Sequence, residues 1–148
     1  MKVWIQRVAE ASVEIEGEKV AEIGRGYLAL LGVTHSDTEK TADEIADRIC
    51  KLRIFEDGNG KTNRSVTDVG GSVIVVSQFT LYADTSRGRR PGFSRAARPE
   101  LAEPLYRRVV AKLRETLGED RVGTGRFGAD MKVRILNDGP FSVELAAD

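Results

Sequence analysis

The sequence predicts an α/β protein in which two amphipathic helices cover a system of β-strands. Apolar side chains recur at helical spacing in two stretches, one after Ser36 and one after Pro99. Elsewhere, apolar residues alternate with polar ones or form short β-branched runs, as is typical of strands. Two helices and several strands favour layers of helix and sheet around a core, an α/β layered sandwich.

Length and composition indicate an ordinary globular protein. The 148 residues are enough for one domain, residues 1–148, and 41% of them are hydrophobic and 31% charged. The formal net charge of +0 and the pI of about 6.6 argue against a generic binder of polyanions. No long apolar run and no charged-then-apolar leader is present, so we expect a cytoplasmic protein without a membrane segment.

In the first half of the chain, strand signals precede the first helix. Alternation in residues 3–15 predicts a strand, and the Gly-containing sequence at 16–19 predicts a hairpin turn. The apolar run 27–33 is short enough for a buried strand. Ser36 and Glu39 have the spacing of a capping box at a helix start. The apolar stripe of this helix consists of Ala42, Ile45, Ala46, Ile49 and Leu52.

The second half adds a central strand and the second helix. Residues 72–82 are rich in β-branched side chains and predict one strand over this whole length. Pro99 suits the first position of a helix, and Gly118 suits its end. The buried stripe between them consists of Ala102, Leu105, Val109, Leu113 and Leu117.

The C-terminal region has the pattern of a hairpin that is interrupted by Gly139-Pro140. Residues 131–136 and 141–145 both resemble strands. Proline cannot donate to a sheet ladder, and glycine weakens a strand interior. From local sequence alone, Gly-Pro commonly marks a tight turn between two such strands.

Several apparent functional motifs are ruled out by the sequence around them. The sequence GTGRFG at 123–128 has dinucleotide-loop spacing, but a strand-like segment and no helix follows it. His35 is the only histidine and Cys50 the only cysteine, so a histidine-based triad and an ordinary zinc site are both disfavoured. Cys50 lies within the first helical stretch, where we expect it to be buried and inert. We expect no metal and no cofactor.

Residues 87–98 form the one strongly basic stretch, RGRRPGFSRAAR, with five arginines and no acid. Charge alone leaves two interpretations open. The stretch is either a solvated loop or a patch that contacts phosphates, for which arginine forks are suited.

Several stretches resemble one family, the D-aminoacyl-tRNA deacylases. They include IQRV, LRIFED, DVGGSVIVVSQFTLYADT, GRRPGFS, TGRFGADM and NDGPFS, in the family's order and over essentially the whole chain. The resemblance implies a three-layer β/β/α sandwich with mixed and antiparallel sheets and two main helices. It also implies a homodimer with sites at the subunit interface, and cleavage of the ester between a D-amino acid, or glycine, and tRNA. The expected partner is tRNA, with no DNA and no membrane.

The same resemblance assigns the candidate site residues. Ser77 and Gln78 match the signature beside the scissile ester, and the main chain at Phe79 and Thr80 matches the region that holds the ester and the substrate's amino end. The remaining candidates are substrate-binding: Gly139 and Pro140 as a Gly-cis-Pro pair that enters the partner's site, Arg7 as its support, and Phe127 and Met131.

The chain departs from the usual family pattern at one place, directly after the Gly-Pro pair. The family usually has Gly-Pro-Val-Thr, whereas this chain has Phe141 and Ser142 after the Gly-Pro pair. Ser142 keeps the hydroxyl group of the usual threonine, and Phe141 is bulkier than the usual valine.

Two other interpretations remain open. A sister deacylase class carries its Gly-Pro in trans and tolerates L-alanine. A non-catalytic nucleic-acid-binding module could instead use the arginine-rich stretch, although the neutral net charge speaks against it.

Overall fold

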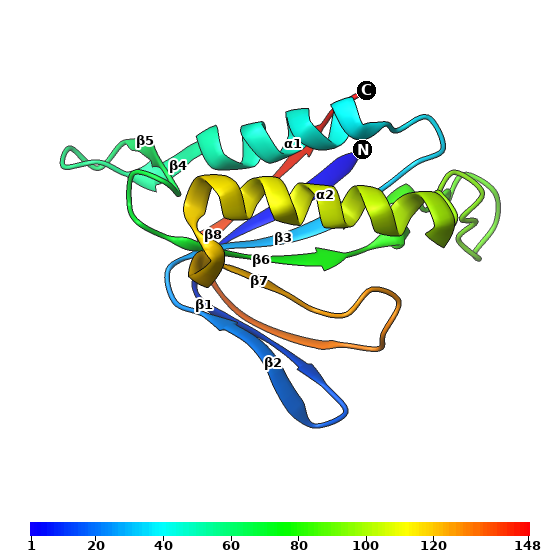
Figure 1. Ribbon diagram of the computed structural model, residues 1–148, viewed down its shortest axis with the longest axis horizontal. Helices are drawn as coiled ribbons and strands as arrows, with labels where there is room; N and C mark the ends of the chain where they lie inside the picture. The colour runs from blue at the N-terminus through cyan, green and yellow to red at the C-terminus, as the bar shows by residue number, and fades with distance from the viewer.

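The computed structural model describes residues 1–148 and has three layers (Figure 1). Helices α1 (Glu39–Lys51) and α2 (Pro99–Leu117) lie side by side on one face of the main sheet. On the other face lies a second, smaller layer, here called the second sheet, in which β2 and the first half of β8 (residues 132–137) pair with residues 8–15 of β1 (Figure 1). The predicted β/β/α sandwich with two main helices is therefore confirmed.

The large sheet is mixed, with strand order β2-β1-β3-β6-β7 and β8 paired to β1. Its β3–β6 and β6–β7 pairs are parallel, and β1 pairs antiparallel with β2, β3 and β8. A separate hairpin of β4 and β5 projects from the end of α1 (Figure 1). The strands are β1 (Lys2–Ile15), β2 (Glu18–Ile23), β3 (Gly26–Gly32), β4 (Arg53–Glu56), β5 (Thr62–Ser65), β6 (Ser72–Ser77), β7 (Val122–Thr124) and β8 (Lys132–Ala146).

Two apolar cores separate the three layers. The larger core lies between the helices and the main sheet and includes both predicted helix stripes, apart from the partly buried Leu52 at its edge. The smaller core is built from β1, β2, β3 and β6 and includes Val13, Leu28 and Ile74. Cys50 is buried on α1 as predicted, and burial raises the pKa of its thiol. Neither helix is long and apolar enough to cross a membrane.

The predicted helix ends are confirmed for α2 but not for the start of α1. Pro99 is the first residue of α2, and Gly118 ends it with a φ of 104°. In α1 the N-cap is Thr38, whose side chain accepts from the Thr41 N–H while the Thr41 hydroxyl accepts from the Thr38 N–H. The capping box predicted from Ser36 and Glu39 is wrong, because a threonine two residues later offers the same exchange with its N3 residue.

The central strand is shorter than predicted. β6 ends at Ser77, and residues Phe79–Tyr82 form a 3₁₀ turn instead of a continued strand. Gly32 at the end of β3 makes this possible, because a Cβ there would lie 3.1 Å from the Gln78 oxygen and 3.1 Å from the Leu81 Cβ. The chain therefore folds back over the end of β3 directly after the last β6 residue.

The predicted C-terminal hairpin is also wrong. Residues 132–137 and 142–146 do not pair with each other. Both pair with β1, the first segment with residues 8–14 and the second with residues 2–6. The four residues between them, 138–141, form an outward bulge where the ladder loses register. Figure 1 shows β1 and β8 bending together at this point, which carries the pair from the main sheet into the second sheet.

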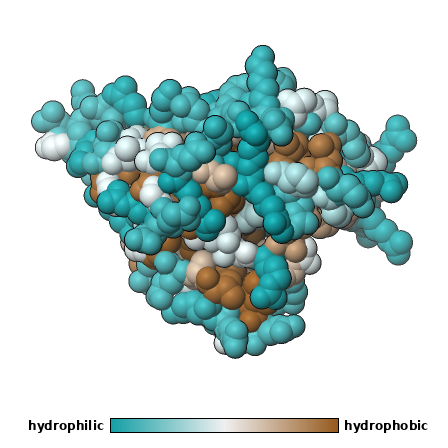
Figure 2. All heavy atoms as spheres, in the orientation of Figure 1, coloured by the Kyte–Doolittle hydropathy of each residue, from teal (hydrophilic) through white to brown (hydrophobic).

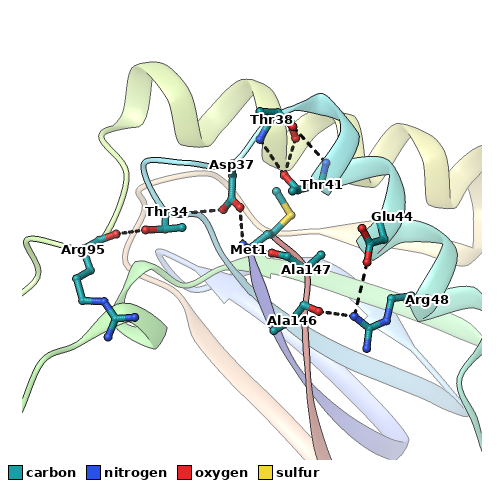
Figure 3. A network of polar contacts seen from close by, with 10 residues as sticks. All are labelled: Met1, Thr34, Asp37, Thr38, Thr41, Glu44, Arg48, Arg95, Ala146 and Ala147. Atoms are coloured by element: carbon teal, nitrogen blue, oxygen red, sulfur yellow. Dashed lines mark hydrogen bonds and ion pairs between the residues drawn. The ribbon is translucent and has the colours of Figure 1, made fainter.

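A polar network joins the N-terminus to the loops beyond β3 (Figure 3). The Met1 α-ammonium donates to Asp37 Oδ1 at 2.5 Å, and the Thr34 N–H donates to Asp37 Oδ2 at 2.8 Å. The Thr34 hydroxyl in turn donates to the Arg95 carbonyl at 2.5 Å. Because Asp37 is only 5% exposed, this ion pair fixes the start of β1, the β3–α1 connection and the arginine-rich stretch relative to one another.

Candidate active site

A cavity of about 580 Å³ lies at the carboxyl end of β6. Its lining includes Ser77, Gln78 and Phe79 from the end of that strand, together with Phe127 and Met131 from the segment between β7 and β8. The structure thus brings these sequence-predicted residues to one place. Most of the lining is apolar, as is usual for a pocket that binds an organic ligand with a few polar groups.

Three further segments complete the wall: the end of β3 with Leu31 and Val33, the arginine-rich stretch, and α2. Sequence reasoning did not single out their residues as site residues. Phe93 comes from the arginine-rich stretch, and its ring meets that of Phe79 edge-to-face at a centroid distance of 5.0 Å. Tyr106 comes from α2, and its hydroxyl donates to the Val75 carbonyl at 2.8 Å. Burial raises the pKa of Tyr106 to about 12, so this phenol stays neutral and serves as a wall, not as a proton carrier at neutral pH.

The polar part of the site is the turn that follows β6. The Gln78 N–H bonds to the Leu31 carbonyl at 2.8 Å, and the Gln78 amide donates to the Thr80 hydroxyl. The N–H groups of Phe79 and Thr80 open the 3₁₀ turn, where the first amides have no acceptor within the turn. They are therefore free to donate to a bound group. Thr80 itself is exposed and does not line the cavity.

No side chain is arranged as an activating base for the Ser77 hydroxyl. The ring of His35, the only histidine, makes its hydrogen bond with the Ser94 carbonyl at 2.7 Å. Asp130 is the only carboxylate in the cavity lining, but its side chain is 88% exposed and contacts Lys132 Nζ at 3.3 Å. Nowhere do three His, Cys, Asp or Glu side chains gather into a group that could hold a metal ion.

The Gly139–Pro140 bulge is held by Arg7, which is only 8% exposed. Arg7 Nε donates to the Asp138 carbonyl at 2.9 Å, and a terminal nitrogen donates to the Ile54 carbonyl at 2.5 Å. The Gly139–Pro140 peptide bond is cis, as the resemblance implies. A buried guanidinium with two carbonyl acceptors is a rigid support for the bulge.

The residues that depart from the usual family pattern take part in the same support. The Phe141 ring lies 4.7 Å from the Arg7 guanidinium carbon in a cation–π contact. The Phe141 N–H donates to Asn137 Oδ1 at 2.9 Å, and Asn137 Nδ2 donates to the Ser142 hydroxyl at 3.3 Å. The larger ring covers the supporting arginine, and serine retains a hydroxyl contact at this position.

Within one chain the bulge and the cavity lie far apart. Arg7 pairs with Tyr27 and Tyr27 with Val73, whereas Ser77 is four residues further along β6. At about 3.3 Å per residue this is a separation of about 13 Å along the strands, and the three spacings from β8 to β6 add about 14 Å across them. Arg7, Gly139 and Pro140 therefore do not line the cavity of their own chain.

β8 carries two exposed apolar side chains, which are consecutive and therefore lie on opposite faces of the strand. Leu136 is 55% exposed and Ile135 is 37% exposed. Figure 2 shows a mostly hydrophilic surface, with exposed apolar atoms gathered over the second sheet at the bottom of the view. An edge strand of this length with exposed apolar side chains is a candidate for pairing with another protein surface.

Comparison with known proteins gives full-length matches. The sequence model of a family described as "D-Tyr-tRNA(Tyr) deacylase" matches residues 4–146. A protein of Symbiobacterium thermophilum named D-aminoacyl-tRNA deacylase is 54% identical over 148 residues, all of this chain and 97% of that protein. A protein of the same name from Cereibacter sphaeroides is 57% identical over 143 residues, 97% of each chain.

Two solved structures are also similar. The first, titled "c-Myc DNA Unwinding Element Binding Protein", has a TM-score of 0.95 and 41% identity, covering 100% of this chain and 99% of that one. The second, titled "Structural Analysis of a probable eukaryotic D-amino acid tRNA deacylase", has a TM-score of 0.84 over 97% of each chain. Its 17% identity supports the fold alone.

Proposed function

Because the chain belongs to the D-Tyr-tRNA(Tyr) deacylase family, we propose that it hydrolyses the ester of D-aminoacyl-tRNA and releases the free D-amino acid and tRNA. The observation that carries this proposal is the cavity at the end of β6, a largely apolar space that is bordered by the start of the 3₁₀ turn. The same reaction on glycyl-tRNA, mischarged on the alanine tRNA, is part of the proposal.

The turn after β6 can supply main-chain hydrogen-bond donors, which are the main requirement for ester hydrolysis. Water attack on an ester develops negative charge on the carbonyl oxygen, and fixed donors in a water-poor site stabilise that charge. We assign this role to the Phe79 and Thr80 N–H groups, because they open the turn that directly follows the cavity-lining Gln78. The Gln78–Thr80 side-chain bond keeps the turn in one arrangement.

Activation of the water is assigned to the substrate. The Ser77 hydroxyl has no hydrogen bond to a base, and His35 is engaged with Ser94. The 2′-hydroxyl of the terminal ribose lies next to the ester in any aminoacyl-tRNA. It can accept a hydrogen bond from the attacking water and relay the water's proton to the 3′ oxygen as the ester bond breaks. We propose that it takes the place of a protein base.

We expect the Ser77→Ala and Asp130→Asn variants to retain deacylase activity within about tenfold of the parent, since neither side chain is held as a nucleophile or base. A substrate whose terminal ribose lacks the 2′-hydroxyl should be cleaved far more slowly by all three proteins. Single-turnover deacylation rates measure both effects. A folded but inactive Ser77→Ala protein, or full activity on the 2′-deoxy substrate, would refute substrate assistance.

Selection of the D configuration is assigned to the Gly139–Pro140 bulge. The enzyme has to accept many D side chains and reject all L-aminoacyl-tRNAs, so discrimination has to act at the chiral centre. A wedge of main chain excludes the wrong hand without reading the side chain, and it cannot swing aside as a rotamer can. The contacts from Arg7 and Phe141 support such a fixed wedge.

The wedge is proposed to act in the partner subunit's cavity, within a homodimer. The separation of the bulge from its own cavity, about 13 Å along and about 14 Å across the sheet, supports this arrangement. The exposed apolar side chains of Ile135 and Leu136 on the edge strand β8 are compatible with a dimer, because interfaces bury exposed apolar side chains. In a two-fold dimer each subunit would complete the other's site.

Release of amino acid from four charged tRNAs tests the proposed activity. We expect rapid release from D-tyrosyl-tRNA and glycyl-tRNA and none above background from L-tyrosyl-tRNA. L-Alanyl-tRNA, the substrate of the alternative trans-Gly-Pro class, should also remain intact. Equal release of D- and L-tyrosine would contradict the proposal, and release confined to L-alanine would favour the alternative class.

A second candidate is a non-catalytic nucleic-acid-binding module. The observation in its favour is the similar structure whose title names binding to a DNA element. Binding of tRNA without any turnover in the same assay would favour this candidate.

A further inference from the structure

The arginine-rich stretch divides into an anchored base and a free tip. At the base, Asp84 and Gly92 exchange two main-chain hydrogen bonds of 2.7 and 2.8 Å, and the Ala97 N–H donates to the Val33 carbonyl at 2.9 Å. Between Asp84 and Gly92 the chain turns back through exposed residues that carry Arg87, Arg89 and Arg90. We call these three side chains the arginine tip.

The arginine tip has no partner within the chain. None of its three guanidinium groups takes part in a hydrogen bond, ion pair or cation–π contact, whereas Arg108 binds Asp43 at 2.6 Å and Arg107 binds Glu103 at 2.8 Å. The nearby Asp84 carboxylate accepts from the N–H and hydroxyl of Ser86 instead. Three unpaired arginines on one short turn make a local positive patch on a chain with no net charge.

The base of the stretch fixes the tip at the mouth of the cavity. Phe93 follows Arg90 after two residues, lines the cavity and touches Phe79 of the turn after β6. Arg90 is three residues from Phe93, and three residues span at most about 10 Å, so the main chain at Arg90 lies within about 10 Å of this cavity-lining residue. Figure 1 shows the stretch at the end of the molecule opposite the β4–β5 hairpin.

We propose that the arginine tip binds backbone phosphates within a few nucleotides of the 3′ end of the tRNA whose ester lies in the cavity. This inference rests on the proposed function and adds a contact to it. A stacked nucleic-acid strand advances about 3.4 Å per nucleotide, so about 10 Å corresponds to roughly three nucleotides. Arginine forks match phosphate oxygens, and phosphate contacts give affinity and register without reading sequence. One tip can therefore serve many tRNAs.

The test replaces the tip in an Arg87→Gln, Arg89→Gln, Arg90→Gln triple variant of the full chain. A matched control, Lys19→Gln, Lys51→Gln, Lys61→Gln, removes the same charge from exposed sites on β2, on α1 and between β4 and β5. The tip makes no internal contact, so its variant should melt at the parent temperature. The substrates are D-tyrosyl-tRNA and the 3′-D-tyrosyl ester of adenosine, which lacks the neighbouring phosphates.

For the tip variant we expect a KM for D-tyrosyl-tRNA about tenfold higher, an unchanged kcat, and unchanged kinetics on the adenosine ester. The slope of log(kcat/KM) against log salt should become shallower by about two, from three lost charges at about 0.7 each. The control should behave as the parent. An unchanged KM on tRNA, equal losses on both substrates, or an equal loss in the control would overturn the proposal. A parent protein inactive on both substrates would instead refute the proposed function itself.

Discussion

Replacing Gly139 with valine is expected to abolish deacylation of D-tyrosyl-tRNA, with a loss of at least about a hundredfold. Gly139 has a φ of 134°, a backbone conformation that side-chain-bearing residues rarely adopt. A Cβ at this position would lie 3.0 Å from an Arg7 nitrogen and 3.1 Å from the Phe141 nitrogen. The substitution would therefore displace the bulge from the arginine that supports it.

Gly60→Val is the matched control for this variant. Gly60 also has a positive φ, 74°, but a Cβ there would meet nothing within 4 Å. Both variants should remain folded by circular dichroism, and Gly60→Val should keep the parent rate. A Gly139→Val protein that deacylates at the parent rate and still rejects L-tyrosyl-tRNA would show that the bulge does not select the substrate.

The sequence predicted the helices well because their information is local. Apolar spacing placed both buried stripes, and Pro99 and Gly118 marked the ends of α2, where the structure has them. The start of α1 was misplaced by two residues, since Ser36 and Thr38 are both acceptable caps by local pattern. Only the backbone geometry, with an extended Thr38, distinguishes them.

The two wrong strand predictions depended on residues distant in sequence. β6 stops at Ser77 because Gly32 of the neighbouring strand leaves room for the chain to turn. The segments around Gly139–Pro140 were taken for a hairpin, since Gly-Pro usually marks a turn. Their true partner is β1, with paired residues 118 to 144 positions apart in the sequence, and only the register shows that both segments follow it.

The candidate site was predictable where a family signature marks it and not elsewhere. Ser77, Gln78 and Phe79 belong to such a signature, and the cavity at the end of β6 includes them. Leu31, Phe93 and Tyr106 come from three other segments, β3, the arginine-rich stretch and α2, and complete the wall through tertiary packing. No local pattern relates these residues to one another, so their convergence became visible only in the fold.

The central claim is that each site is completed by the Gly139–Pro140 bulge of the partner subunit, and mixing two defective subunits tests it most directly. One subunit carries Gly139→Val, and the other carries Ala96→Trp, which fills the cavity. Each homodimer should be inactive. In a heterodimer of the two, one site combines both defects, and the other combines an intact cavity with an intact bulge.

Deacylation of D-tyrosyl-tRNA by the refolded equimolar mixture is the measurement. Half of the dimers would be mixed and each would have one working site, so we predict recovery of about a quarter of the parent activity. If each chain used its own bulge, every subunit would carry one defect. A mixture that forms heterodimers and remains inactive would therefore contradict the claim.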